Sequence, residues 1–115
     1  MEQPIYPVGT KAISQKRKEL APKTLAAFQA FSHQVFVDGA LPAKTKQLIA
    51  VAVAHVTQCP YCIRSHTKQA KLKGATEQEI MEAIWVAAEM RAGGAVSHSI
   101  LAIDAMSQNE TKSST

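Results

Sequence analysis

The stretch LIAVAVAHVTQCPYCIRSH, residues 48–66, decides the fold of this chain. Its first nine residues are apolar except for His55, so a helix formed by them has no polar face over two turns. A helix that is apolar all round is normally buried on every side. The stretch therefore predicts a central helix that packs against the rest of the domain and, in so small a chain, against other subunits as well.

The second half of the same stretch holds the chain's two cysteines, Cys59 and Cys62, arranged as C-x-x-C. Pro60 suits the first position of a helix, where its missing N–H group costs nothing, and this places Cys59 near the N-cap. His66 follows Cys62 by four residues, so the two side chains share one helix face. These residues are the candidate site, and the apolar segments on either side are its scaffold.

Prolines, glycines and the spacing of apolar residues predict the other helices. Thr76 and Glu79 have the spacing of a capping box at a helix start, and the pair Gly93-Gly94 is expected to separate the last two helices. No segment alternates with period two, so no sheet is expected. The prediction is an all-α domain of about five to six helices, at residues 10–20, 22–37, 43–57, 60–73, 76–92 and 95–106.

With 115 residues, the chain has the size of one domain, and we expect a single domain over residues 1–115. Residues 1–9 contain two prolines and a glycine, which indicates an extended arm. Residues 107–115 are polar and rich in serine and threonine, which indicates a flexible tail. Lys44 and Lys46, at the start of the central helix, are expected to be solvated.

The charge and hydropathy of the chain exclude two classes of partner. A net charge of +4 and a pI near 9.2 are compatible with nucleic-acid binding. The basic residues are spread along the chain, however, and no aromatic residues are interleaved with them. This pattern favours positions on solvated helix faces. The longest apolar run is far shorter than the ~20 residues of a membrane span, and the start lacks the pattern of a secretory signal. We expect a cytoplasmic protein without nucleic-acid or membrane partners, in which a C-x-x-C pair is more often redox-active or metal-binding than structural.

The motif suits thiol chemistry. A cysteine attacks only as its thiolate, and an ordinary thiol with a pKa near ~8.5 is mostly protonated at neutral pH. The helix N-terminus, nearby basic side chains and His66 can each favour the thiolate. Because Cys62 is the cysteine next to the histidine, we assign Cys62 as the attacking thiol, Cys59 as the resolving thiol that closes a disulfide with it, and His66 as the base. This cycle needs no metal or other cofactor.

Two alternatives to this chemistry stand beside it. Cys59, Cys62 and His66 can be three ligands of a zinc ion, with His55 or a neighbouring chain supplying the fourth ligand that structural zinc usually takes. The two cysteines can also be buried and inert, in a non-catalytic oligomeric protein.

The residues resemble the alkylhydroperoxidase D-like (AhpD-like) proteins of the carboxymuconolactone decarboxylase family. The resemblance covers about residues 41–103 and rests on the apolar helix, the Cys59-x-x-Cys62-x-x-x-His66 signature, Gly74-Ala75-Thr76-x-x-Glu79-Ile80, and the Gly93-Gly94 pair with His98 beyond it. It implies an all-α domain assembled into homotrimers or homohexamers. It also implies reduction of a hydroperoxide substrate by the thiol pair, which a reducing partner protein or thiol then resets. The family name equally permits a decarboxylating lyase, although that chemistry has no need for a thiol pair.

Two positions depart from the better-equipped peroxidase members of that family. Those often carry glutamate where this chain has Gln47, and histidine where this chain has Tyr61. A glutamine cannot relay a proton, and general acid–base catalysis is commonly worth ~10²–10⁴-fold in rate. The resemblance therefore predicts slow peroxidase turnover unless another group takes over the proton relay. His55 is the first candidate for this relay; its alternative is a histidine that is hydrogen-bonded to the backbone. Glu82 and Glu89 are further candidates for the relay. Tyr61, Trp85 and His98 are either walls of a substrate cavity or packing residues.

Overall fold

The protein is all-helical in the computed structural model, which describes the backbone of residues 5–113 and the side chains of residues 5–108. Within that range the chain forms five α-helices and no strands. The helices are α1 (Lys11–Leu20), α2 (Pro22–Phe36), α3 (Ala43–Thr57), α4 (Pro60–Leu72) and α5 (Glu77–Ser113). The predicted all-α class is confirmed, and the first four helices lie within one residue of their predicted bounds.

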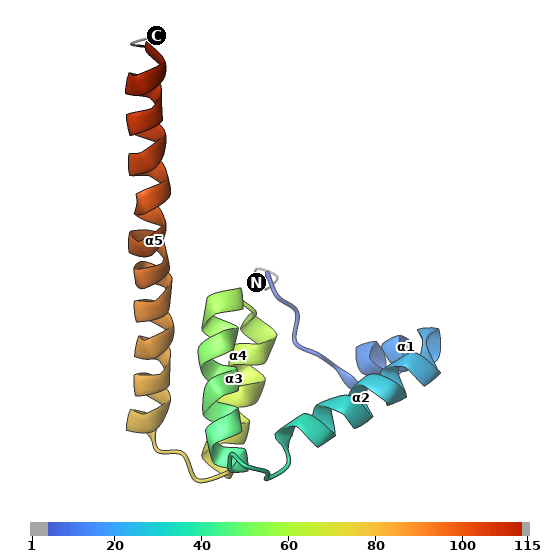
Figure 1. Ribbon diagram of the computed structural model, residues 1–115. Coiled ribbons are helices and arrows are strands. Elements are labelled where there is room, and N and C mark those ends of the chain that lie inside the picture. Colours follow the sequence, from blue (N-terminus) through green and yellow to red (C-terminus); the bar gives the residue numbers. More distant parts are fainter. Residues whose placement is uncertain (1–4, 114–115) are drawn as a thin grey trace.

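The core sits where α3 packs between α4 and α5 (Figure 1). Val51 of α3 is fully buried against Ala70 of α4, and Ala75 and Ile80 close the cluster from the loop and from the start of α5. The expectation that α3 is buried on every side is wrong for the single chain, because Ile49 and Val53 are 48% and 52% exposed. One face of α3 makes the core, and the other is open.

The turn between α2 and α3 is held by two side-chain hydrogen bonds. The Asp38 carboxylate accepts from the Ala43 amide at 2.6 Å and so caps the start of α3. Lys46 donates from its ammonium to the Val37 carbonyl at 2.7 Å, at the C-terminal end of α2. This second bond corrects the prediction for Lys46, which is half-buried in the turn rather than freely solvated.

Helix α5 continues through the pair Gly93-Gly94, where the sequence predicted a break. Its start matches the prediction, because the Thr76 amide donates to the Glu79 carboxylate at 2.9 Å and the Glu79 amide donates to the Thr76 hydroxyl at 3.0 Å. The predicted tail is also helical as far as Ser113, and residues 114 and 115 lie outside the described part. The chain therefore has one long final helix instead of two short ones and a tail.

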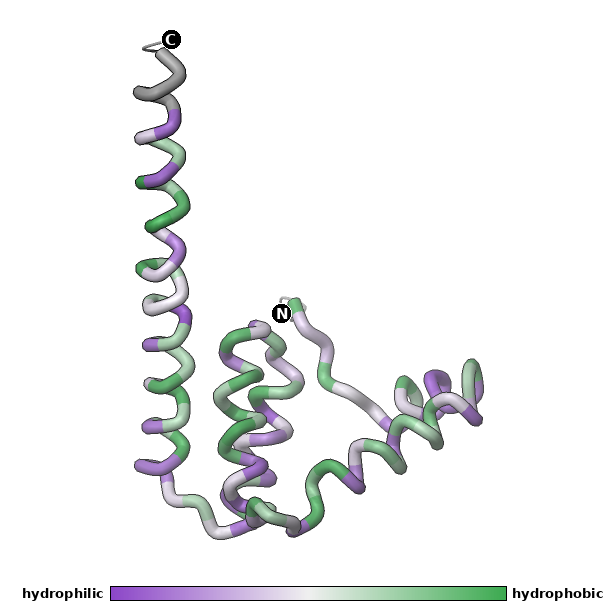
Figure 2. Tube along the Cα trace, in the orientation of Figure 1, coloured by the Kyte–Doolittle hydropathy of each residue, from purple (hydrophilic) through white to green (hydrophobic). Residues whose placement is uncertain are grey.

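The molecule is far more open than a compact domain of its size. Its radius of gyration is 20.8 Å, whereas a compact chain of this length has about 13 Å. It exposes 9411 Å², whereas a compact protein of this mass exposes about 6,100 Å². Much of the difference comes from α2 and from the second half of α5, which rises beyond α3 and α4 and carries hydrophobic residues without a neighbour (Figure 2). None of the described helices combines the length and hydropathy needed to cross a membrane.

Candidate active site

The hairpin between α3 and α4 brings the motif into position. Gln58 takes a left-handed conformation with φ of 56° and ends α3, after which the Cys59 amide donates back to the Ala54 carbonyl at 3.1 Å. Pro60 then starts α4, as its fixed φ and missing donor allow. Cys59 is the N-cap residue, and its sulfur accepts from the Cys62 amide at 3.3 Å.

The two sulfurs face each other across this first turn of α4. Their Sγ atoms lie 2.6 Å apart, and both cysteines are free thiols. A disulfide bond has a length of about 2.05 Å, so closure requires a shift of about half an ångström. The pair is therefore placed for reversible disulfide formation without rearrangement of the backbone.

The surroundings of the pair shift the pKa values of the two thiols in opposite directions. The hydrogen bond from Cys62, helped by the Cys62 amide, lowers the pKa of Cys59. The same hydrogen bond, together with burial and the charge on Cys59, raises the pKa of Cys62. A negative charge is therefore more stable on Cys59 than on Cys62, whereas the sequence assigns the attacking thiolate to Cys62.

His66 is held by two residues from other helices. Its Nδ1 lies 2.7 Å from the Gln47 Oε1 atom, and because that oxygen only accepts, Nδ1 carries the hydrogen and Nε2 keeps its lone pair. The ring stacks on Phe36 of α2 with centroids 5.0 Å apart. Burial lowers the pKa of His66, so the ring is a neutral base at physiological pH.

An apolar cavity of about 390 Å³ opens in front of the motif, where α2, α3 and α4 meet. Cys62 and His66 both line it, whereas Cys59 does not. The remaining walls are almost entirely apolar and comprise Val35, Phe36, Ile49, Ala50, Val53 and Ala54, with Thr57 and Lys46 at the ends. Cys62, rather than Cys59, is therefore the sulfur that a molecule in this cavity meets.

A second and more polar pocket, of about 530 Å³, lies on the other side of His66. Gln47, Ser65 and Gln69 line it, together with Asp38 and His33. The His66 ring thus separates an apolar compartment that contains Cys62 from a polar one that contains its partner Gln47.

The structure places three other candidate residues, His55, Tyr61 and His98, outside the cavity that Cys62 lines. His55 bonds through Nδ1 to the Val51 carbonyl of its own helix at 2.7 Å, as its backbone-bonded alternative describes. Tyr61 donates its hydroxyl to the Pro7 carbonyl at 2.9 Å and packs edge-on against Tyr6, so it anchors the N-terminal arm. His98 bonds to the Gly94 carbonyl at 2.8 Å and lines a separate shallow pocket.

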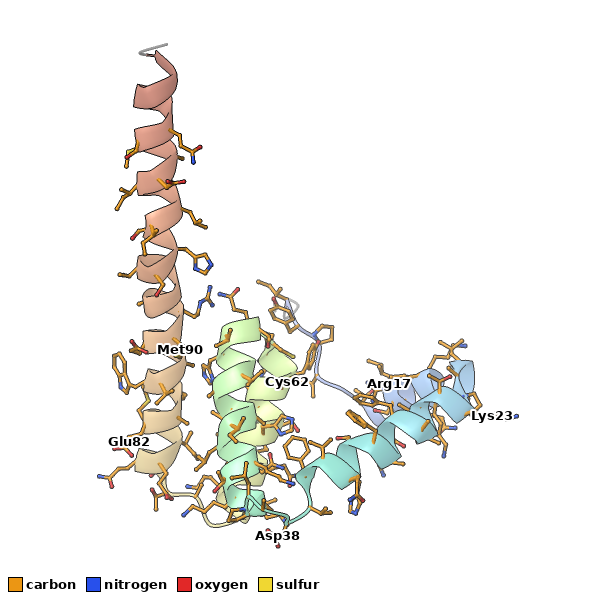
Figure 3. The ribbon with its side chains drawn as sticks, viewed as in Figure 1. Arg17, Lys23, Asp38, Cys62, Glu82 and Met90 are labelled. Atoms are coloured by element: carbon orange, nitrogen blue, oxygen red, sulfur yellow. The ribbon has the colours of Figure 1, made fainter. Side chains whose placement is uncertain are left out.

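The geometry bears on the candidate carboxylate Glu82 and on the proposed zinc ligands. Glu82 projects from α5 on the side away from α3 and α4 (Figure 3), and Trp85 lines a pocket beside it. Among the described side chains, no three His, Cys, Asp or Glu residues come together as a metal site. His66 instead turns its Nδ1 to Gln47.

Of the residues that line the cavity, sequence reasoning assigned only Cys62 and His66 to the site, and Phe36 and Lys46 are two of those that it missed. Lys46 had a usable signal, because Lys46, Ala50, Val53, Ala54 and Thr57 follow the three- and four-residue spacing of one helix face. Phe36 had none, because its contact with His66 spans a turn whose direction the sequence does not specify.

Comparisons with known proteins find relatives for most of this chain. A family model described as "Carboxymuconolactone decarboxylase family" matches residues 22–105. The protein "Uncharacterized protein 4 in cox locus" of Paracoccus denitrificans is 69% identical over 72 residues, which cover 63% of this chain and 65% of that protein. The chain therefore spans just under two thirds of the length of that relative.

Two solved structures extend the comparison to the fold. A carboxymuconolactone decarboxylase family protein from Legionella pneumophila is 36% identical with a TM-score of 0.64, over 70% of this chain and 75% of that one. Another family member, from Thermotoga maritima and proposed to be involved in an antioxidative response, is 33% identical with a TM-score of 0.53, over 56% of this chain and 66% of that one. The family model and the shared helical fold lead to one conclusion: this chain is an AhpD-like protein that belongs to the carboxymuconolactone decarboxylase family.

Proposed function

We propose that the protein is a thiol-dependent peroxidase that reduces organic hydroperoxides through Cys62 and Cys59. The observation that carries the proposal is that Cys62 and His66 line one apolar cavity while the Cys59 sulfur lies 2.6 Å from that of Cys62. An apolar cavity suits the organic part of a hydroperoxide. The antioxidative role proposed for the relative from Thermotoga maritima points in the same direction.

The reaction balances without any external cofactor. His66 Nε2 takes one proton from the reduced thiol pair, and the resulting Cys62 thiolate attacks the terminal oxygen of the hydroperoxide. The O–O bond breaks, Cys62 becomes a sulfenic acid, and the leaving alkoxide receives the proton from His66 to give an alcohol. Cys59 then attacks the Cys62 sulfur, the S–S bond forms, and the displaced hydroxide leaves as water with the second thiol proton.

The location of the thiolate at rest is compatible with this order. Negative charge is stabilised first on Cys59, but a separation of 2.6 Å lets a proton pass between the two sulfurs. Because Cys62 faces the cavity, the attacking species is the minor form in which Cys59 holds the proton. A reducing partner protein or small thiol then resets the disulfide by thiol–disulfide exchange.

The test of this proposal follows each thiol by mass spectrometry after the reduced protein meets cumene hydroperoxide. The wild type is expected to form the Cys59–Cys62 disulfide, and Cys59→Ser is expected to hold a sulfenic acid on Cys62, seen as one added oxygen. Cys62→Ser is expected to leave Cys59 unmodified. Both thiols remaining free in the wild type would refute the peroxidase function, and a sulfenic acid on Cys59 in Cys62→Ser would reverse the two roles.

A matched pair of histidine variants tests the base. His66→Gln is expected to slow peroxide consumption by about 10²-fold, the low end of general acid–base effects. His55→Gln is the control, because His55 bonds to its own helix and does not line the cavity. Equal rates for the two variants would remove His66 from the mechanism.

A further inference from the structure

We propose that the cavity beside Cys62 takes hydroperoxides whose apolar chain ends in a carboxylate, and that Lys46 binds that carboxylate. This inference rests on the proposed peroxidase function and names its substrate class. The observation behind it is that Lys46 carries the only full charge among the residues that line the cavity.

Lys46 lies at the opposite end of the cavity from the two cysteines. It sits in the first turn of α3, whereas the Cys59 amide bonds to Ala54 in the last turns of the same helix. With a rise of 1.5 Å per residue, the eight residues from Lys46 to Ala54 span about 12 Å. A ligand that follows the α3 face between them has one end near the ammonium and a more distant part near Cys62.

The positive charge of Lys46 is available to such a ligand. Its ammonium donates one hydrogen bond, to the Val37 carbonyl, and an ammonium has three donors. Among the described side chains, the one Lys or Arg ion pair is that between Lys44 and Glu79 at 2.8 Å. Asp38, the nearest acid along the chain to Val37, is occupied by the Ala43 amide and lines the other pocket.

The walls of the cavity define the rest of the ligand. Val35, Ile49 and Val53 present half-exposed apolar surface that a hydrocarbon chain can cover, and burial of this surface favours binding. The volume of about 390 Å³ is near the lower end of the roughly 300–1,000 Å³ typical of small-molecule sites. It therefore suits one acyl chain, as in a hydroperoxide of a free fatty acid, rather than a phospholipid with two chains.

The kinetic test compares an acid with its ester. Lys46→Gln keeps a donor for Val37 but removes the charge, and Lys46→Arg keeps the charge; Lys44→Gln is the matched control two residues away. With linoleic acid hydroperoxide, Lys46→Gln is expected to lower kcat/KM about tenfold, mainly through KM, as expected for loss of a part-exposed charged hydrogen bond. With its methyl ester and with cumene hydroperoxide, Lys46→Gln is expected to lose far less turnover than with the acid, and Lys46→Arg and Lys44→Gln are expected to match the wild type with the acid.

Equal losses on the acid and the ester would overturn the assignment of Lys46. Reduction of a phosphatidylcholine hydroperoxide as fast as the free acid would overturn the single-chain substrate class.

A binding experiment separates this inference from the proposed function. Calorimetric titration with linoleic acid, which has no hydroperoxide group, is expected to give about tenfold weaker binding to Lys46→Gln than to the wild type, with equal binding of methyl linoleate. If the wild type reduces cumene hydroperoxide but binds the acid no better than Lys46→Gln does, the inference fails and the peroxidase function stands. If the acid binds through Lys46 but no hydroperoxide is reduced, the function fails and the carboxylate site stands.

Discussion

Gln47 is the residue on which the speed of the proposed reaction depends. It holds the Nδ1 hydrogen of His66 in place at 2.7 Å, but as a neutral amide it cannot stabilise the imidazolium that forms when His66 takes a proton. A carboxylate at this position can do both. Gln47 thus orients the His66 ring but does not strengthen it as a proton acceptor.

Gln47→Glu is expected to increase peroxide consumption about tenfold to a hundredfold, within the usual range of general acid–base effects. In the wild type, burial lowers the pKa of His66. The neutral base form therefore persists as the pH falls below ~6.5, the ordinary pKa of histidine. The rate is expected to fall only when the pH drops below the lowered pKa of His66. A glutamate raises that pKa by favouring the imidazolium, so the acid limb of the pH–rate profile moves to higher pH. Steady-state rates across pH, with an NMR titration of the His66 ring, provide the measurement.

The control for this variant is Gln69→Glu, which adds a carboxylate to the same polar pocket. No hydrogen bond of His66 involves Gln69 in the described part of the chain, so its rate and pH profile are expected to stay near those of the wild type. An unchanged profile in Gln47→Glu would show that proton transfer by His66 does not limit the reaction.

At the scale of elements, the final helix shows where sequence patterns lead to an error. A glycine inside a helix costs about 0.5–1 kcal/mol relative to alanine, which is too little to break a helix with strong helix formers on both sides. The pair Gly93-Gly94 predicts a helix end, yet α5 runs through it. Pro22, Pro42 and Pro60 were reliable signals because proline removes a backbone donor and so marks a helix start.

Gly94→Ala is expected to stabilise the protein by about 0.5–1 kcal/mol, because alanine loses less backbone freedom on folding. A methyl group built at this position meets no atom within 4 Å. Urea unfolding of the variant and the wild type gives the difference. Destabilisation would indicate either a break in α5 or a second helix packed closely on Gly94.

The candidate site was predictable in part for similar reasons. The spacing of Cys59, Cys62 and His66 along one helix is local, so the sequence alone located them on the first turns of α4. The bond between Gln47 and His66 joins residues 19 positions apart and depends on how α3 packs on α4. The contact of Phe36 with His66 depends on the turn after α2, and no local pattern reports the path of that turn.

At the scale of the whole molecule, we propose that the protein assembles into a homotrimer or homohexamer. The single chain exposes 9411 Å², about 3,300 Å² more than a compact protein of its mass, and this excess is of the size that obligate interfaces bury. Much of it is apolar, as at Val96 and Ile100 of α5, which are 71% and 70% exposed. Such surface is normally covered by a partner.

Ile100→Asp is expected to dissociate the assembly and lower the melting temperature, because it places a charge in the buried interface. Ala102→Asp is the matched control, since a residue two positions along lies on the opposite side of the helix. Sedimentation velocity gives the mass of each variant. A monomeric wild type, or equal dissociation by both substitutions, would contradict an interface on the Ile100 side of α5.

The stacked rings of Phe36 and His66 form a wall between the two pockets, and this wall decides from which side substrate and solvent reach the site. His66 faces the apolar cavity on one side and the polar pocket on the other, and its stacking on Phe36 and its bond to Gln47 keep the ring from turning over. An oily molecule therefore meets the imidazole from the side of Cys62, and water meets it from the side of Gln47. Because Nδ1 already holds a hydrogen bonded to Gln47, a long hydroperoxide that fills the apolar cavity also shields the lone pair of Nε2 from solvent, so the proton taken from the thiol pair stays in the site until the alkoxide receives it.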